Sequence, residues 1–169
     1  MAHVSMAHPV APLLVDAIAS AAAAEQIPVS RGGTYVCIEG PQFSSLAESQ
    51  TYKQHGYDVI GMTAMPEAKL AREAELSYAI IAMVTDYDCW HPDHDHVDVA
   101  SVIRIVHSNA EKAARLVARV LRDFPAEHPV CPAGSNTTLD SAMITAPDAR
   151  DPNLLKKLGS IVERLQAGN

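Results

Sequence analysis

The feature that most constrains the fold is an unbroken apolar run from Tyr78 to Val84, the most hydrophobic stretch of the chain. A run without polar interruptions suits a strand that is buried on both faces, because its side chains point alternately to the two sides of a sheet. Such strands occur in parallel sheets that carry helices on both faces. The run therefore predicts a buried strand over residues 78–84 in an α/β fold.

Other strands and helices alternate along the chain. Short apolar runs at residues 34–38 and 58–62 predict two further strands. Helices are predicted from alanine-rich composition, a capping signal or an apolar stripe at residues 13–26, 45–55, 66–74, 97–122 and 154–165. Residues 123–151 are rich in Pro, Ala, Ser and Thr and are predicted to be loop. This alternation indicates a mixed, largely parallel sheet flanked by helices.

Length and charge narrow the class of protein. The 169 residues suffice for one core, and we expect a single domain over residues 1–169. A formal net charge of −7 disfavours a broad surface for nucleic acid or a membrane, so neither partner is expected. The longest alanine-rich stretch is too short to span a bilayer, and no secretory signal is visible. Three widely spaced cysteines predict reduced thiols in the cytoplasm.

Two aspartates directly follow the predicted buried strand, at Asp86 and Asp88. If the backbone stays extended, carboxyl groups two residues apart lie on the same side. Repulsion between two such close carboxylates raises the pKa of one of them, and so does burial, so that one carboxyl group can stay protonated. The protonated group can donate to a ring nitrogen while the other accepts from an exocyclic amine, a pattern that suits a 6-aminopurine. The alternative, a solvated strand end or a turn cap, is the commoner case for such a pair taken alone.

Two other clusters also follow predicted strands. In the segment 39–45, Phe43 offers a ring that can stack on a flat base, and Ser44 offers a hydroxyl for its edge. Met62 can place a thioether against a sugar, and Thr63 can place a hydroxyl against an anion. Taken singly, each has an ordinary explanation as a glycine turn, a core side chain or a helix cap. Ligands of open α/β sheets bind beyond the carboxyl ends of strands, so the shared placement is the informative observation.

The segment from His91 to His96 holds three histidines and two aspartates, which resembles a ligand-rich loop. No helical histidine spacing and no second ligand cluster accompany it, so we predict an exposed polar loop and no metal site. The chain has no glycine fingerprint of a phosphate or dinucleotide loop, and no organic cofactor is expected.

In this order and spacing, the clusters resemble the 5′-methylthioadenosine phosphorylase branch of the purine nucleoside phosphorylases. The resemblance is nearly continuous over residues 1–122 and weak beyond them. Its most specific stretches are residues 3–7, 33–36, 38–49, 58–67 and 85–90.

The resemblance implies a role for each cluster. Phe43 and Ser44 would contact the purine, and Met62 the ribose. Thr63 would help to bind phosphate. Asp86 would read N7 as donor and general acid, and Asp88 would bind the 6-amino group. The remaining implied contacts are on the 5′-methylthio side of the substrate, where Val99 and Val102 would line the pocket and His3 would reach a neighbouring subunit's site.

The implied reaction is phosphorolysis of S-methyl-5′-thioadenosine to adenine and 5-methylthioribose 1-phosphate, with inorganic phosphate as co-substrate. Related enzymes that prefer 6-oxopurines carry asparagine at the position of Asp86, so aspartate favours adenine. The resemblance also implies a cytoplasmic homotrimer of methionine and purine salvage. A methylthioinosine or purine nucleoside phosphorylase, or a non-catalytic remnant, are the alternatives.

Members of this family usually extend well over a hundred residues further at the N-terminus, where the first strand and a glycine-rich phosphate loop lie. We therefore expect this chain to be the C-terminal part of a phosphorylase domain, with the N-terminal strands missing. It would contain the purine side of the site and lack most of the phosphate side.

Overall fold

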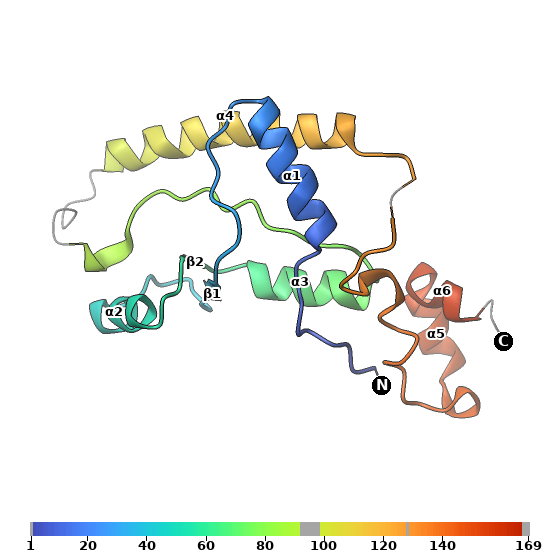
Figure 1. Cartoon of the computed structure of the whole chain (residues 1–169). Coiled ribbons are helices and arrows are strands. Elements are labelled where there is room, and N and C mark those ends of the chain that lie inside the picture. Colours follow the sequence, from blue (N-terminus) through green and yellow to red (C-terminus); the bar gives the residue numbers. More distant parts are fainter. Residues whose placement is uncertain (1, 92–98, 128, 167–169) are drawn as a thin grey trace. The chain divides into compact units, whose positions relative to one another are not determined.

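A computed structural model describes residues 2–91, 99–127 and 129–166 (Figure 1). Its helices are α1 (Pro12–Ala24), α2 (Leu46–Gln54), α3 (Ala64–Glu73), α4 (Val99–Asp123), α5 (Pro152–Leu158) and α6 (Ser160–Gln166). Its strands are β1 (Tyr35–Cys37) and β2 (Val59–Gly61), and single 3₁₀ turns are η1 (Asp88–Trp90), η3 (Ser135–Thr137) and η4 (Pro147–Ala149). Helices and a small parallel sheet make this an α/β fold, as the sequence predicts.

The chain divides into two compact units. One, which we call the sheet unit, consists of Asp16–Met65 and Ile80–Ala126. The other, the terminal unit, consists of Met1–Val15, Pro66–Ala79 and Glu127–Asn169. The expectation of one domain over the whole chain stays a prediction.

The sheet consists of β1 and β2, which run parallel and are joined through α2. Tyr35 lies opposite Val59 and Cys37 lies opposite Gly61. The Tyr35 hydroxyl occupies the space beside Gly61, where an added Cβ would lie only 1.7 Å from it. Both strands lie within their predicted runs, so these two predictions are confirmed.

The core of the sheet unit forms where α1 meets α4. Ala21 and Ala22 of α1 pack with Leu116 of α4, and Ile81 lies against this cluster. The small side chains of Ala21 and Ala22, the buried residues of α1, allow this helix to approach α4 closely. The helix predicted at residues 97–122 is confirmed by α4.

The predicted buried strand over residues 78–84 is wrong. The segment has no strand pairing, and although Ile81 packs into the core, Met83 and Val84 are more than half exposed. A strand requires a neighbour to accept and donate along its backbone. Within the described residues β1 and β2 pair with each other, and the Val84 carbonyl accepts instead from the Asn109 side-chain amide at 2.9 Å.

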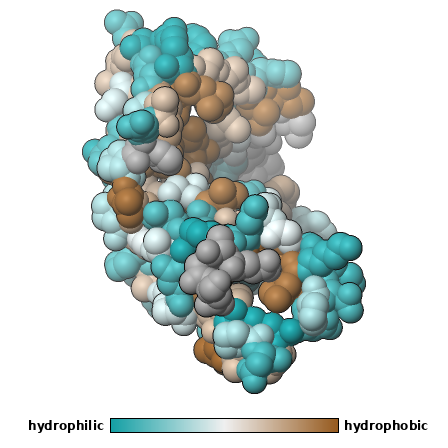
Figure 2. Space-filling model, turned by 90° about the vertical axis from the view of Figure 1, so that its right-hand side faces the viewer, coloured by the Kyte–Doolittle hydropathy of each residue, from teal (hydrophilic) through white to brown (hydrophobic). Residues whose placement is uncertain are grey.

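Apolar side chains also remain at the surface of α4. Leu116 is buried, but several members of the predicted stripe and its neighbours are exposed, and hydrophobic patches are visible in the space-filling view of Figure 2. Among the side chains of α4 that the structure describes, the exposed large apolar ones are Ile103, Ile105, Val106, Val117 and Leu121.

Polar contacts, one of them from a buried arginine, hold the terminal unit together. The Arg72 guanidinium is 4% exposed and donates to the carbonyl oxygens of Ala133, at 2.9 Å, and His8. Arg164 forms a two-point ion pair with Glu75, whose Oε1 also accepts from the Leu139 backbone N–H. These contacts join segments that are far apart in the sequence.

The single helix predicted over residues 154–165 is wrong, because the structure has α5 and α6 instead. Gly159 separates them with φ 50° and ψ −124°, a conformation outside the helical region that glycine adopts readily. In the described part of 123–151, the elements are the last residue of α4, the short turns η3 and η4 and a single bridge from Met143 to Ala2, which agrees with the loop prediction. Among the helices of the described ranges, none has the length and apolar character needed to cross a bilayer.

Candidate functional site

The segment between β1 and α2, which we call the base loop (residues 39–45), is shaped by its two ends. Gly40 has φ 69°, and an added Cβ there would lie 2.6 Å from the Met62 sulfur. At the other end Ser45 caps α2 in a capping box: its backbone N–H and hydroxyl both donate to Glu48 Oε2, at 2.7 and 2.8 Å. Donation from the Ser45 backbone and hydroxyl lowers the pKa of Glu48. The capping box confirms the predicted start of this helix.

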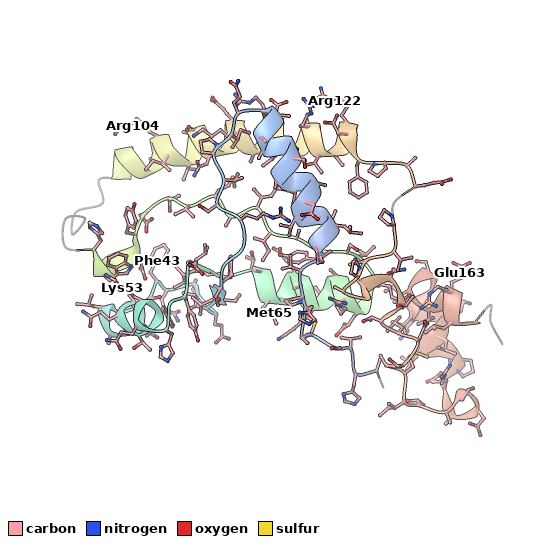
Figure 3. The ribbon with its side chains drawn as sticks, viewed as in Figure 1. Phe43, Lys53, Met65, Arg104, Arg122 and Glu163 are labelled. Carbon is pink, nitrogen blue, oxygen red and sulfur yellow. The ribbon has the colours of Figure 1, made fainter. Side chains whose placement is uncertain are left out.

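The two predicted base contacts lie in the middle of this loop. Phe43 is 86% exposed, so its ring is accessible for stacking (Figure 3). The Ser44 hydroxyl oxygen is buried and has no hydrogen-bond partner within the described part of the chain. Buried polar groups in folded proteins nearly always have a partner, so an unsatisfied hydroxyl beside an exposed ring is a feature suited to a ligand.

Met62 and Thr63 follow directly after β2. The Met62 side chain is half-buried and packs against Gly40, so it lies beside the base loop. Thr63 is exposed, immediately before the first residue of α3. Both lie at the carboxyl end of the strand, where the sequence places them.

The segment from Thr85 to His91, which we call the acid loop, carries both aspartates. Its backbone does not stay extended: Asp88 has φ 59° and begins η1. The Asp86 carboxylate folds back, accepting from the Asp88 backbone N–H at 2.9 Å and from the Thr85 hydroxyl at 2.7 Å. The condition under which the two carboxyl groups would lie side by side on a strand is therefore not met, and a turn held by Asp86 takes its place.

The base loop and the acid loop meet. The Cys89 thiol donates to the Ser44 carbonyl oxygen at 3.6 Å, and η1 packs against α2. The structure thus brings together the three polar clusters that follow predicted strands, through Gly40 with Met62 and through Ser44 with Cys89.

One further contact between these elements has no signature in the sequence. Lys53, in the last turn of α2, places its ammonium nitrogen 3.4 Å from the centre of the Trp90 ring in η1. The two residues are 37 positions apart in the sequence, and no spacing rule connects a helix lysine to an aromatic residue on another element. Only the packing of α2 on η1 reveals the pair.

The remaining predicted site residues are placed differently. His3 belongs to the terminal unit, where its backbone N–H donates to the Ala142 carbonyl at 2.9 Å and its side chain is exposed. Val99 and Val102 lie in the first turns of α4, with side chains outside the described set.

No metal site emerges from the described residues, since no group of three or more His, Cys, Asp or Glu side chains comes together in them. Residues 92–96 of the histidine-rich segment lie outside the described ranges. The predictions of no metal and no organic cofactor therefore remain predictions.

Comparisons with known proteins give a consistent result. The family model described as "Phosphorylase superfamily" matches residues 1–122. The chain is 65% identical over 168 residues to an S-methyl-5′-thioadenosine phosphorylase of Bradyrhizobium diazoefficiens, covering 99% of this chain and 58% of the relative. A protein of the same name from Rhodospirillum rubrum is 55% identical over 168 residues, covering 98% and 56%.

Solved structures are also similar. A methylthioadenosine phosphorylase from an Antarctic soil metagenomic library has a TM-score of 0.85 at 40% identity, covering 95% of this chain and 56% of that one. A methylthioadenosine phosphorylase from Schistosoma mansoni in complex with adenine has a TM-score of 0.68 at 33% identity, covering 76% and 50%. The chain thus spans little more than half the length of the relatives that it matches.

Proposed function

We propose that this chain, which belongs to the phosphorylase superfamily, is part of an enzyme that cleaves S-methyl-5′-thioadenosine with inorganic phosphate. The products are adenine and 5-methylthioribose 1-phosphate. One observation carries the proposal: the loops with the residues suited to a purine meet at Ser44 and Cys89 in a chain 65% identical to an S-methyl-5′-thioadenosine phosphorylase.

The base would stack on the exposed ring of Phe43. The Ser44 hydroxyl, which lacks a partner within the described residues, would bond the edge of the base. Met62, packed against the base loop at Gly40, would contact the ribose. This arrangement combines one apolar face with a few polar groups, as small-ligand sites usually do.

The acid loop would supply the polar contacts of the purine. Phosphorolysis breaks the bond between the base and the anomeric carbon, and negative charge accumulates on the departing purine. A donor at N7 stabilises that charge more in the transition state than in the substrate, which lowers the barrier. Asp86 would provide this proton as general acid, and Asp88 would accept from the 6-amino group.

Thr63, exposed at the start of α3, would help to bind the phosphate co-substrate. Val99, Val102 and His3 would surround the 5′-methylthio group, His3 from a neighbouring subunit. The complete protein would work as a cytoplasmic homotrimer in methionine and purine salvage, without a metal or an organic cofactor.

A panel of nucleosides tests the proposal in the complete protein. Methylthioadenosine, adenosine, methylthioinosine and inosine are each supplied with phosphate, and release of the free base is followed. Methylthioadenosine should give the highest kcat/KM. A preference for methylthioinosine or inosine would instead support a 6-oxopurine phosphorylase, and inactivity on all four would contradict phosphorolysis of these nucleosides.

A further inference from the structure

The acid loop is held at two separated points, one just before α2 and one in the last turn of that helix. In the base loop, two residues before α2 begins, the Ser44 carbonyl oxygen accepts from the Cys89 thiol. In the last turn of α2, Lys53 lies over Trp90. Contacts near both ends of α2 fix both the position and the direction of a short segment, which one contact cannot do.

The Lys53 contact has the geometry of a cation–π interaction. Its ammonium nitrogen is 3.4 Å from the centre of the Trp90 ring, well inside the range of about 6 Å within which such contacts are attractive. In the part of the chain that the structure describes, Lys53 takes part in none of the ion pairs, and its electrostatic contact there is with the Trp90 ring.

Trp90 is in turn part of an aromatic cluster in the same loop. Its ring meets the Tyr87 ring edge to face, with centroids 6.1 Å apart and planes at 75°. The His91 ring lies 5.2 Å from Trp90 and 5.0 Å from Tyr87. Trp90 therefore packs against Tyr87, which stands between the two aspartates in the sequence.

We propose that Lys53 is a positioning residue: by holding Trp90 against α2 it fixes the acid loop, and with it Asp86 and Asp88, relative to Phe43 and Ser44. This inference rests on the proposed function, because it assigns to the two loops the two sides of one purine site. Lys53 itself touches no reacting atom in this account.

The size of the effect follows from the contact. A residue can shift the position of a loop only by the free energy of its own interaction. For a cation–π contact at an exposed site this corresponds to a loss of about two- to fivefold in the population of the correct loop position. Removing the charge should therefore raise KM for the nucleoside, or lower kcat/KM, by about that factor.

The experiment compares Lys53→Met, which keeps length and loses charge, with Lys53→Arg, which keeps a cation able to stack on the ring. Lys112→Met, at an exposed position of α4, makes the same chemical change away from the loop. Each variant of the complete protein is measured for kcat and KM with methylthioadenosine and for adenine affinity by calorimetry. Trp90 is the one tryptophan of this chain, and a Trp90→Phe variant isolates its fluorescence by difference.

Lys53→Met should change the Trp90 emission and lower kcat/KM and adenine affinity about two- to fivefold. Lys53→Arg should keep kcat/KM and adenine affinity near the native values, and Lys112→Met should leave all three quantities unchanged. Unchanged Trp90 emission would overturn the contact. A changed emission with native kinetics and native adenine affinity would overturn the positioning role. If the native protein binds adenine without cleaving methylthioadenosine, the proposed function fails and the adenine affinities alone decide the role of Lys53.

Discussion

Replacement of Asp86 by asparagine isolates the chemistry of the proposed base contact from the structure of the loop. The Asp86 carboxylate accepts from the Asp88 backbone N–H and from the Thr85 hydroxyl. An asparagine keeps one carbonyl oxygen for the Asp88 N–H. Its amide group can face the Thr85 hydroxyl, which is able to rotate and accept instead. The turn of the acid loop should therefore survive the substitution.

The substitution should nevertheless lower the activity on methylthioadenosine. An amide cannot deliver a proton to N7, so the general acid is lost for the adenine leaving group. Losing a hydrogen bond to a group that is charged, or that becomes charged in the transition state, costs about 1.5–3 kcal/mol, or about one to two orders of magnitude in rate. For 6-oxopurines the amide is a suitable partner. The ratio of kcat/KM for methylthioadenosine to that for inosine should therefore fall by at least about tenfold.

The assay follows base release from both nucleosides in the native and Asp86→Asn proteins. Asp58→Asn serves as control, because the Asp58 carboxylate also accepts a backbone N–H, from Thr34 at 2.7 Å, but lies outside the acid loop. A ratio that is the same in the native protein and in Asp86→Asn would refute the assignment of Asp86. Equal changes in both variants would show that loss of an aspartate anywhere in the sheet unit is sufficient.

Two further predictions concern the terminal unit. Arg72→Met removes the buried guanidinium that donates to the His8 and Ala133 carbonyls. It should lower the unfolding free energy, measured by urea denaturation, by about 2–5 kcal/mol. A change below about 1 kcal/mol would contradict this role. The second prediction concerns the Cys131 thiol. Burial alone would raise its pKa, but hydrogen bonds, of which that with the Ser135 side chain is the strongest, lower the pKa below its usual value. The difference in unfolding free energy between the native protein and Cys131→Ala should therefore increase as the pH rises towards about 8.5, and this increase should be lost at lower pH. A difference that does not change with pH would contradict the prediction.

Local signals in the sequence were sufficient for several elements. Ser45 and Glu48 have capping-box spacing, and the structure forms both bonds of that box. The runs around Val36 and Ile60 form the two parallel strands, because the α2 segment between them is long enough for a parallel crossover. These features depend on neighbours in the sequence, which a pattern can describe.

Features that depend on partners elsewhere in the chain were not predictable in this way. Residues 78–84 have the composition of a buried strand, but a strand forms only where a neighbouring strand completes its backbone hydrogen bonds. The contact of Lys53 with Trp90 arises from the packing of η1 on α2. The fold-back of Asp86 onto the Asp88 N–H is instead a local turn, the alternative that the sequence leaves open for this pair. The order of the clusters along the chain indicated which side chains would gather, but not the turn that presents them.

The phosphate dependence of adenine release tests the central proposal most directly. The complete protein is incubated with S-methyl-5′-thioadenosine with and without inorganic phosphate, and adenine and the sugar product are quantified. Phosphorolysis predicts equal amounts of adenine and 5-methylthioribose 1-phosphate, formed only when phosphate is present. Adenine released at the same rate without phosphate, together with free methylthioribose, would contradict the proposal and identify water as the nucleophile.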